Sequence, residues 1–240
     1  MSHKLDKHAE AYTDNTQYDF DNEVMLKWYS ERIVALTQDA SSLLELGLGH
    51  GYTTNIFSQN IQRHVVLEGS SAVIENYKHK FPNCRSEMIE TLFETYNTTE
   101  CFDVIVLGFI LEHVDDPAAI LRQYKNYLSP NGQIFVSVPN AEVMNRRLGH
   151  LAGMLPNMKT LSEYDLLLGH QRYYTAETLT KELADSGYEI IHMEGIYLKP
   201  FTSSQMSSLK LEPSVYSALC HMGVNYPELS CGLLAQARIL

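Results

Sequence analysis

The sequence lacks the features that mark membrane, exported and disulfide-linked proteins. Its longest apolar run, residues 104–111, is far shorter than the roughly 20 residues that cross a bilayer, so no transmembrane helix is predicted. Residues 1–15 contain no apolar core of a signal peptide, and we therefore expect a cytoplasmic protein. The four cysteines include no Cys-x-x-Cys pair, which argues against a structural zinc site and a disulfide framework.

Basic residues are also scarce. The chain has 18 lysines and arginines against 29 aspartates and glutamates, a formal net charge of -11. Nucleic-acid backbones attract basic surfaces, so this charge argues against a nucleic-acid partner and favours a small molecule. No repeat and no linker rich in proline and glycine divides the 240 residues, which predicts a single domain over 1–240. We expect a monomer or homodimer that acts away from membranes.

Short apolar runs alternate with helical patterns along most of the chain. This alternation predicts βαβ units, and hence an α/β fold with a doubly wound, mostly parallel, seven-stranded sheet. The predicted strands are 43–48, 65–68, 84–89, 103–107, 134–138, 189–193 and 232–239, of which the last pairs antiparallel beside the sixth. The predicted helices are 19–37, 52–62, 116–127 and 175–187, and a turn is predicted at 130–132.

Two segments exceed what a minimal sheet needs. Residues 1–40 form an N-terminal lead with aromatic residues, among them Tyr18, followed by a helix. Residues 141–174 contain one predicted helix and a stretch too long for a plain connection. Because this insertion follows the carboxyl end of a strand, we expect it to form a cap over a substrate site.

The first strand leads directly into three alternating glycines. Gly47, Gly49 and Gly51 let a ligand approach the backbone without obstruction by a Cβ atom. A dinucleotide fingerprint, Gly-x-Gly-x-x-Gly, would place its third glycine at Tyr52, so the spacing favours a ligand without a diphosphate. Glu68 ends the next strand, where a carboxylate can accept hydrogen bonds from both hydroxyls of a ribose. Together these residues predict a nucleoside site.

The combination of Glu45, the three glycines and Glu68 resembles the S-adenosylmethionine site of class I methyltransferases, which have a Rossmann-like fold. The resemblance covers nearly the whole chain. It implies that the glycines contact the methionine and ribose part, that Glu68 binds the ribose hydroxyls and that Glu45 orients the loop and the amino group. Further cofactor contacts implied by the resemblance are Gly69, then Thr91, Leu92 and Phe93 near the adenine, and Gly108 and Phe109 near the sulfur.

Two shorter segments carry a narrower resemblance. Residues 169–172, ahead of a threonine-capped helix, and residues 198–200 are similar to bacterial methyltransferases related to the ubiquinone-pathway O-methyltransferases. Many members of that group have no assigned substrate, so this similarity implies architecture rather than acceptor.

Two histidines are candidates for proton transfer, because an imidazole accepts a proton near neutral pH. His113 follows the fourth strand, and His170 lies in the insertion. Arg172 and Tyr173, with Tyr18 in the lead, are candidate acceptor-binding residues, although each can equally be structural. The other histidines lack acidic or cysteine partners at ligand spacing, so no metal site is predicted.

We therefore predict an S-adenosylmethionine-dependent methyltransferase that acts on a small molecule. Oxygen is the expected methylated atom, and nitrogen and carbon stay open. Two alternatives are a nicotinamide-dependent oxidoreductase on a similar sheet and a regulatory protein that binds S-adenosylmethionine without catalysis.

Overall fold

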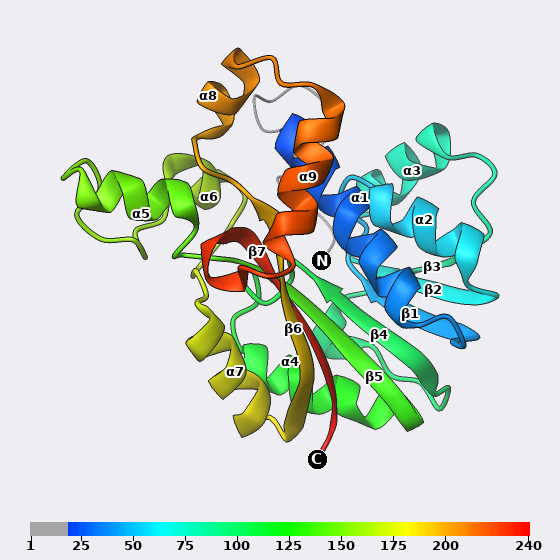
Figure 1. Cartoon of the computed structure of the whole chain (residues 1–240). Coiled ribbons are helices and arrows are strands. Elements are labelled where there is room, and N and C mark those ends of the chain that lie inside the picture. The colour runs from blue at the N-terminus through cyan, green and yellow to red at the C-terminus, as the bar shows by residue number, and fades with distance from the viewer. Residues whose placement is uncertain (1–18) are drawn as a thin grey trace.

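The computed structural model describes residues 19–240, which build a seven-stranded sheet in the order β3-β2-β1-β4-β5-β7-β6 (Figure 1). Within this sheet β7 runs antiparallel to β5 and β6, and the other strands share one direction. The sheet is therefore mixed and mostly parallel. The strands are β1 (Ser42–Leu46), β2 (Arg63–Glu68), β3 (Glu87–Glu90), β4 (Phe102–Gly108), β5 (Leu128–Pro139), β6 (Tyr188–Leu198) and β7 (Ser230–Ile239).

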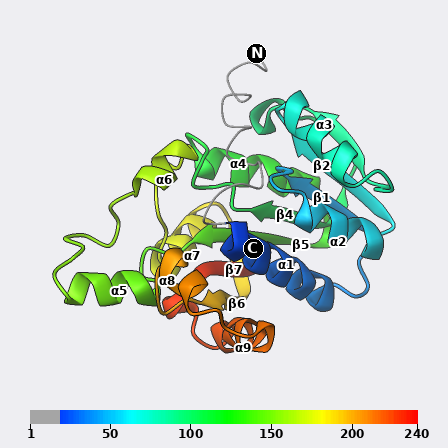
Figure 2. The ribbon, with the colours of Figure 1, turned by 90° about the horizontal axis from the view of Figure 1, so that it is seen from above.

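Helices cover both faces of the sheet (Figures 1 and 2). One face carries α1 (Asp19–Leu36), α2 (Tyr52–Asn60), α3 (Ser71–Lys80) and α9 (Pro213–Gly223), and the other carries α4 (Pro117–Tyr124) and α7 (Ala176–Asp185). Beyond the sheet lie α5 (Met144–Leu151), α6 (Glu163–Leu167) and α8 (Ser203–Ser208). Short 3-10 turns are η3 (Phe93–Thr95), η4 (Lys125–Tyr127) and η5 (Pro227–Leu229). None of the helices within residues 19–240 is long and apolar enough to cross a membrane.

The central strands are buried on both faces, as expected for parallel strands between helical layers. In β1, Leu44 and Leu46 pack with the α4 and α7 layer, whereas Leu43 packs with α1 and α2. All three leucines are at most 1% exposed. The helix predicted to begin after Thr175 does so, because the Thr175 hydroxyl accepts a hydrogen bond from Thr178 N.

Three predictions about secondary structure need correction. Residues 130–132, predicted as a turn, lie within β5, where the pairing with β4 shifts between Phe102 and Val104. The insertion holds two helices rather than one, since Ser162 and Asp165 form a capping box that starts α6. The sequence prediction placed no element at α8 and α9, which lie between β6 and β7.

The insertion leaves the sheet and returns to it at the same point. Ala141 N donates to Tyr174 O at 2.7 Å, and Tyr174 N donates to Pro139 O at 3.2 Å. These bonds close the segment 141–174 into a loop at the carboxyl end of β5. Its residues are therefore held beside the ends of the parallel strands, where open α/β sheets bind ligands.

Candidate active site

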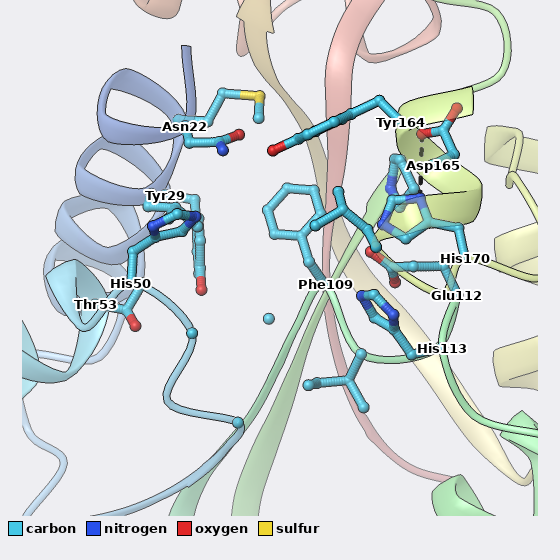
Figure 3. A pocket seen from close by; sticks show the side chains of 18 of the residues that line it. Asn22, Tyr29, His50, Thr53, Phe109, Glu112, His113, Tyr164, Asp165 and His170 are labelled. Atoms are coloured by element: carbon cyan, nitrogen blue, oxygen red, sulfur yellow. Dashed lines mark ion pairs between the residues drawn. The ribbon is translucent and has the colours of Figure 1, made fainter. Parts of the chain in front are cut away.

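A cavity of about 650 Å³ opens at the carboxyl ends of β1, β2 and β4 and extends to the insertion (Figure 3). It brings together residues that the sequence predicted separately as parts of a nucleoside site and of an acid-base site. The predicted residues that line it are Gly47, Gly49, Gly51, Glu68, Gly69, Thr91, Leu92, Phe93, Gly108, Phe109, His113, His170 and Tyr173.

The glycine loop turns through left-handed backbone conformations. Gly47, Gly49 and Gly51 have φ angles of 81°, 48° and 78°, a region that disfavours residues with a Cβ atom. A Cβ at Gly51 would also overlap the ring of Tyr77 on α3, so this glycine is needed for helix packing as well as for the turn. The loop thus exposes its backbone on the cavity at the start of α2.

The Glu68 side chain joins the glycine loop to the end of β2. Its Oε2 accepts a hydrogen bond from Leu48 N at 3.0 Å, and its Oε1 accepts one from Ser70 N at 2.8 Å. Burial raises the pKa of Glu68, and these backbone hydrogen bonds oppose the rise. A carboxylate offers about four acceptor positions, so acceptor capacity remains for a ligand beside these backbone hydrogen bonds.

His113 and His170 lie side by side on the opposite side of the cavity from Tyr29 (Figure 3). Their ring centroids are 4.7 Å apart, and the rings are nearly perpendicular at 82°. The segment after His170 is bonded along the chain that follows β4. Gln171 N donates to Glu112 O, and Gln171 Nε2 donates to His113 O, each at 2.8 Å. This pairing brings the two histidines together from distant parts of the sequence.

Asp165 fixes the orientation of His170. Its Oδ1 lies 3.3 Å from His170 Nδ1, and its Oδ2 accepts hydrogen bonds from Tyr173 Oη and Ser162 N, both at 2.7 Å. Burial raises the pKa of Asp165, but the interactions with His170, Ser162 and Tyr173 outweigh it and hold that pKa well below its usual range. The carboxylate of Asp165 thus faces Nδ1 of the imidazole, although Nδ1 makes no hydrogen bond with the described residues.

Glu112 lies close to both histidines and is fully buried (Figure 3). Neither of its carboxylate oxygens has a hydrogen-bond partner among residues 19–240. Burial raises the pKa of Glu112 to about 7, although the charge of His170 opposes this rise. Ligand atoms of Glu112, His113 and His170 all lie within 4.8 Å of one another, so this cluster could hold a metal ion. The prediction of no metal site considered only ligands close together in the sequence. It therefore missed this cluster, because His170 is distant in sequence from Glu112 and His113.

Two predicted site residues that the structure describes do not line the cavity. Glu45 is 2% exposed and points into the protein, where its oxygens accept hydrogen bonds from Thr53 and Thr54. Arg172 donates to Leu111 O at 2.8 Å and Val114 O at 2.6 Å, so it fastens the insertion rather than facing an acceptor. Tyr18 lies outside the described residues.

Sequence reasoning missed several residues that line the cavity. Lys199, in the segment 198–200, contacts Asp21 Oδ2 at 2.8 Å and donates to Ser203 Oγ at 2.7 Å, which links the segment after β6 to α1. Tyr29 enters from α1. No local motif marks these residues as ligand contacts, because their elements meet only in the folded chain.

The chain is similar in sequence to proteins of known family. A family model described as "Methyltransferase domain" matches residues 18–193. The ubiquinone biosynthesis O-methyltransferase of Idiomarina loihiensis is 29% identical over 136 residues, which cover 55% of this chain and 52% of that protein. The chain thus spans about half the length of this relative. The trans-aconitate 2-methyltransferase of Azoarcus sp. strain BH72 is 22% identical over 89% of this chain and 93% of that one.

A solved structure with the same fold is that of the N-methyltransferase NodS from Bradyrhizobium japonicum WM9, in complex with S-adenosylhomocysteine. Its TM-score is 0.58 at 15% identity, and the match covers 94% of this chain and 89% of that one. At this identity the likeness concerns the fold.

Proposed function

Because the chain belongs to the S-adenosylmethionine-dependent methyltransferases, we propose that it methylates a small-molecule acceptor, at an oxygen atom. The observation that carries this proposal is one cavity lined both by the glycine loop with Glu68 and by two adjacent histidines, His113 after β4 and His170 in the insertion. The whole chain, 1–240, acts as one domain in this proposal, with 1–40 and 141–174 as its covering segments.

The residues around the glycine loop fit the cofactor. Glu68 lines the cavity, and Leu48 N and Ser70 N hold its carboxylate in place. A Cβ at Gly47 would lie 2.7 Å from Ile110 Cδ1, and the φ of 81° at this residue also disfavours a side chain. We assign the ribose hydroxyls to Glu68, the methionine part to the glycines and the adenine to the neighbourhood of Leu92 and Phe93.

When bound, the cofactor supplies a methyl group on a sulfonium, which is already activated for displacement. The protein therefore has to align the acceptor, exclude water and remove the proton that the acceptor loses. We assign the removal of this proton to the pair His113 and His170, with Asp165 orienting His170. Tyr173 and the rest of the 141–174 insertion form the acceptor wall, and covering the site limits the access of water.

One pair of titrations separates this function from its alternatives. We expect S-adenosylhomocysteine to bind the wild-type protein in calorimetry, and NADH to cause no change in a fluorescence titration. Turnover with a panel of hydroxyl, amine and carboxylate acceptors, read by mass spectrometry, identifies the methylated atom. Binding of NADH alone would favour the oxidoreductase, and cofactor binding without turnover on any acceptor would favour the regulatory protein.

The affinity for S-adenosylhomocysteine is expected to fall as the pH is lowered through the pKa of Glu68. Burial raises that pKa, so Glu68 takes up a proton at a higher pH than an exposed glutamate does. Affinity is full above this pKa, where the carboxylate accepts the ribose hydrogen bonds, and is lost below it. Calorimetry between about pH 4.5 and 8 tests this. The Glu68→Gln variant, which cannot titrate, should give a weaker but flat profile. A wild-type profile that is equally flat would contradict the assignment.

A further inference from the structure

Glu112, His113 and His170 stand out among the side chains of residues 19–240 that could bind a metal. In this part of the chain no other set of three or more histidine, cysteine or acidic side chains brings its ligand atoms within 4.8 Å of one another. All three line the cavity, so an ion can reach them from the space in which we place the acceptor. The cluster joins the segment after β4 to the insertion, and Gln171 holds these two segments together through the oxygens of Glu112 and His113.

The Glu112 carboxylate is the observation that points to a bound cation. It is fully buried, and neither oxygen has a hydrogen-bond partner among the described residues. A buried charge is costly unless it is paired or coordinates a metal. Arg172 acts on Glu112 by its charge, but its guanidinium donates to the carbonyl oxygens of Leu111 and Val114. A cation between Glu112 and the two histidines would supply the missing partner.

Asp165 adds the support that a histidine ligand normally has. Metal-binding histidines are usually fixed by a carboxylate, a carbonyl oxygen or a water at the second ring nitrogen. Asp165 Oδ1 lies 3.3 Å from His170 Nδ1, and Ser162 N and Tyr173 Oη hold this carboxylate in place by donating to Oδ2. The ring of His170 is therefore positioned before an ion arrives.

The donor set decides the class of ion. Two imidazoles and one carboxylate suit divalent ions of the first transition row, such as Zn²⁺, whereas Mg²⁺ and Ca²⁺ prefer oxygen donors. Three protein ligands also leave a coordination position open to water or to a ligand in the cavity.

We propose that Glu112, His113 and His170 bind a divalent transition-metal ion such as Zn²⁺, and that this ion stops the proposed methyl transfer. The second part rests on the proposed function, in which the same histidines take the proton of the acceptor. A neutral imidazole has one acceptor nitrogen, and a metal bound there leaves none for a proton. The glycine loop and Glu68 are not part of the cluster, so the metal-loaded protein still binds the cofactor.

Calorimetry with zinc chloride tests the site without any cofactor. We expect the wild-type protein to bind Zn²⁺ at this cluster and not to bind Mg²⁺ there. Loss of a ligand should weaken Zn²⁺ binding by more than about 100-fold, since loss of an outer partner alone costs about 10- to 100-fold. The variants are Glu112→Gln, His113→Asn and His170→Asn, and His150→Asn, exposed on α5, is the matched control. No binding by the wild type, or wild-type affinity in all three variants, would overturn the site.

Turnover with an acceptor found in the screen tests the exclusion. Zn²⁺ should lower the wild-type rate by at least about 100-fold, the smallest usual contribution of a general base, and a chelator should restore it. The affinity for S-adenosylhomocysteine should stay close to that of the metal-free protein. A rate that bound Zn²⁺ leaves unchanged or raises would overturn the exclusion.

The two kinds of failure are distinguishable. If the protein bound Zn²⁺ but not S-adenosylhomocysteine, the proposed function would fail while the metal site stood. Thermal unfolding shows whether each variant keeps its fold. A variant that does not is set aside, and the remaining ligand variants decide.

Discussion

Replacing Glu68 with alanine is expected to weaken binding of S-adenosylhomocysteine by about 100-fold, the effect of losing two hydrogen bonds to a charged group. The carboxylate is fixed by Leu48 N and Ser70 N, so it is already oriented toward the cavity before a ligand arrives. Alanine removes the acceptors for the ribose and also frees the glycine loop from β2. Calorimetry of the purified variant measures the loss.

The matched control for this substitution is Glu75→Ala. Glu75 is exposed on α3 and does not line the cavity, so its replacement removes the same charge without changing the site. Its affinity should equal that of the wild type. Gly49→Val provides a second route to the same loss, because its φ of 48° disfavours a branched side chain. Unchanged affinity in both Glu68→Ala and Gly49→Val would remove the cofactor site from this loop.

Replacing His170 with asparagine is expected to lower the rate of methyl transfer by about 100- to 10,000-fold, the usual contribution of a general base. Asparagine keeps a polar side chain beside Asp165 but cannot accept the proton. The affinity for S-adenosylhomocysteine should stay close to that of the wild type, since His170 belongs to the insertion and not to the glycine loop or the end of β2, to which we assign the cofactor. Single-turnover kinetics with an acceptor found in the screen measures the rate.

His113→Asn and the double variant show whether the two histidines act as a unit. If they do, the double variant should be little slower than the slower single variant, because groups that act together have non-additive effects. His150→Asn is the control, since His150 is an exposed residue of α5 that does not line this cavity. A wild-type rate in both His113→Asn and His170→Asn would exclude the pair as the base.

The order of strands and helices was largely predictable from local patterns. The runs that form β1 and β4 are mostly buried and largely apolar, and Thr175 marks the start of α7 through its own hydroxyl. The bulge at 130–132 was not predictable, because proline, asparagine and glycine favour a turn whether or not the flanking residues pair with β4. The helix α8 has only six residues, too few for a periodic pattern, whereas α9 was missed although Pro213 stands at its start.

The types of residue in the candidate site were predictable, but the directions in which their side chains point were not. Glu68 ends β2, and strand geometry fixes its place at the carboxyl ends of the parallel strands. Glu45 and Arg172 have the right chemistry in the right segments, yet their side chains bond to Thr53 and to the carbonyl oxygen of Leu111 instead of lining the cavity. The direction of a side chain depends on neighbours that are distant in sequence.

The sequence by itself determined the α/β order, the glycine loop with Glu68 and the presence of an insertion after β5, because each depends on residues close together in the chain. Only the tertiary structure decided which groups share the cavity. Closure of the insertion at Ala141 and Tyr174 brings His170 beside His113, and packing of α1 on the sheet brings Tyr29 over Gly108. The physical reason is that contacts between distant elements form where their buried faces pack, and no local pattern records the partner.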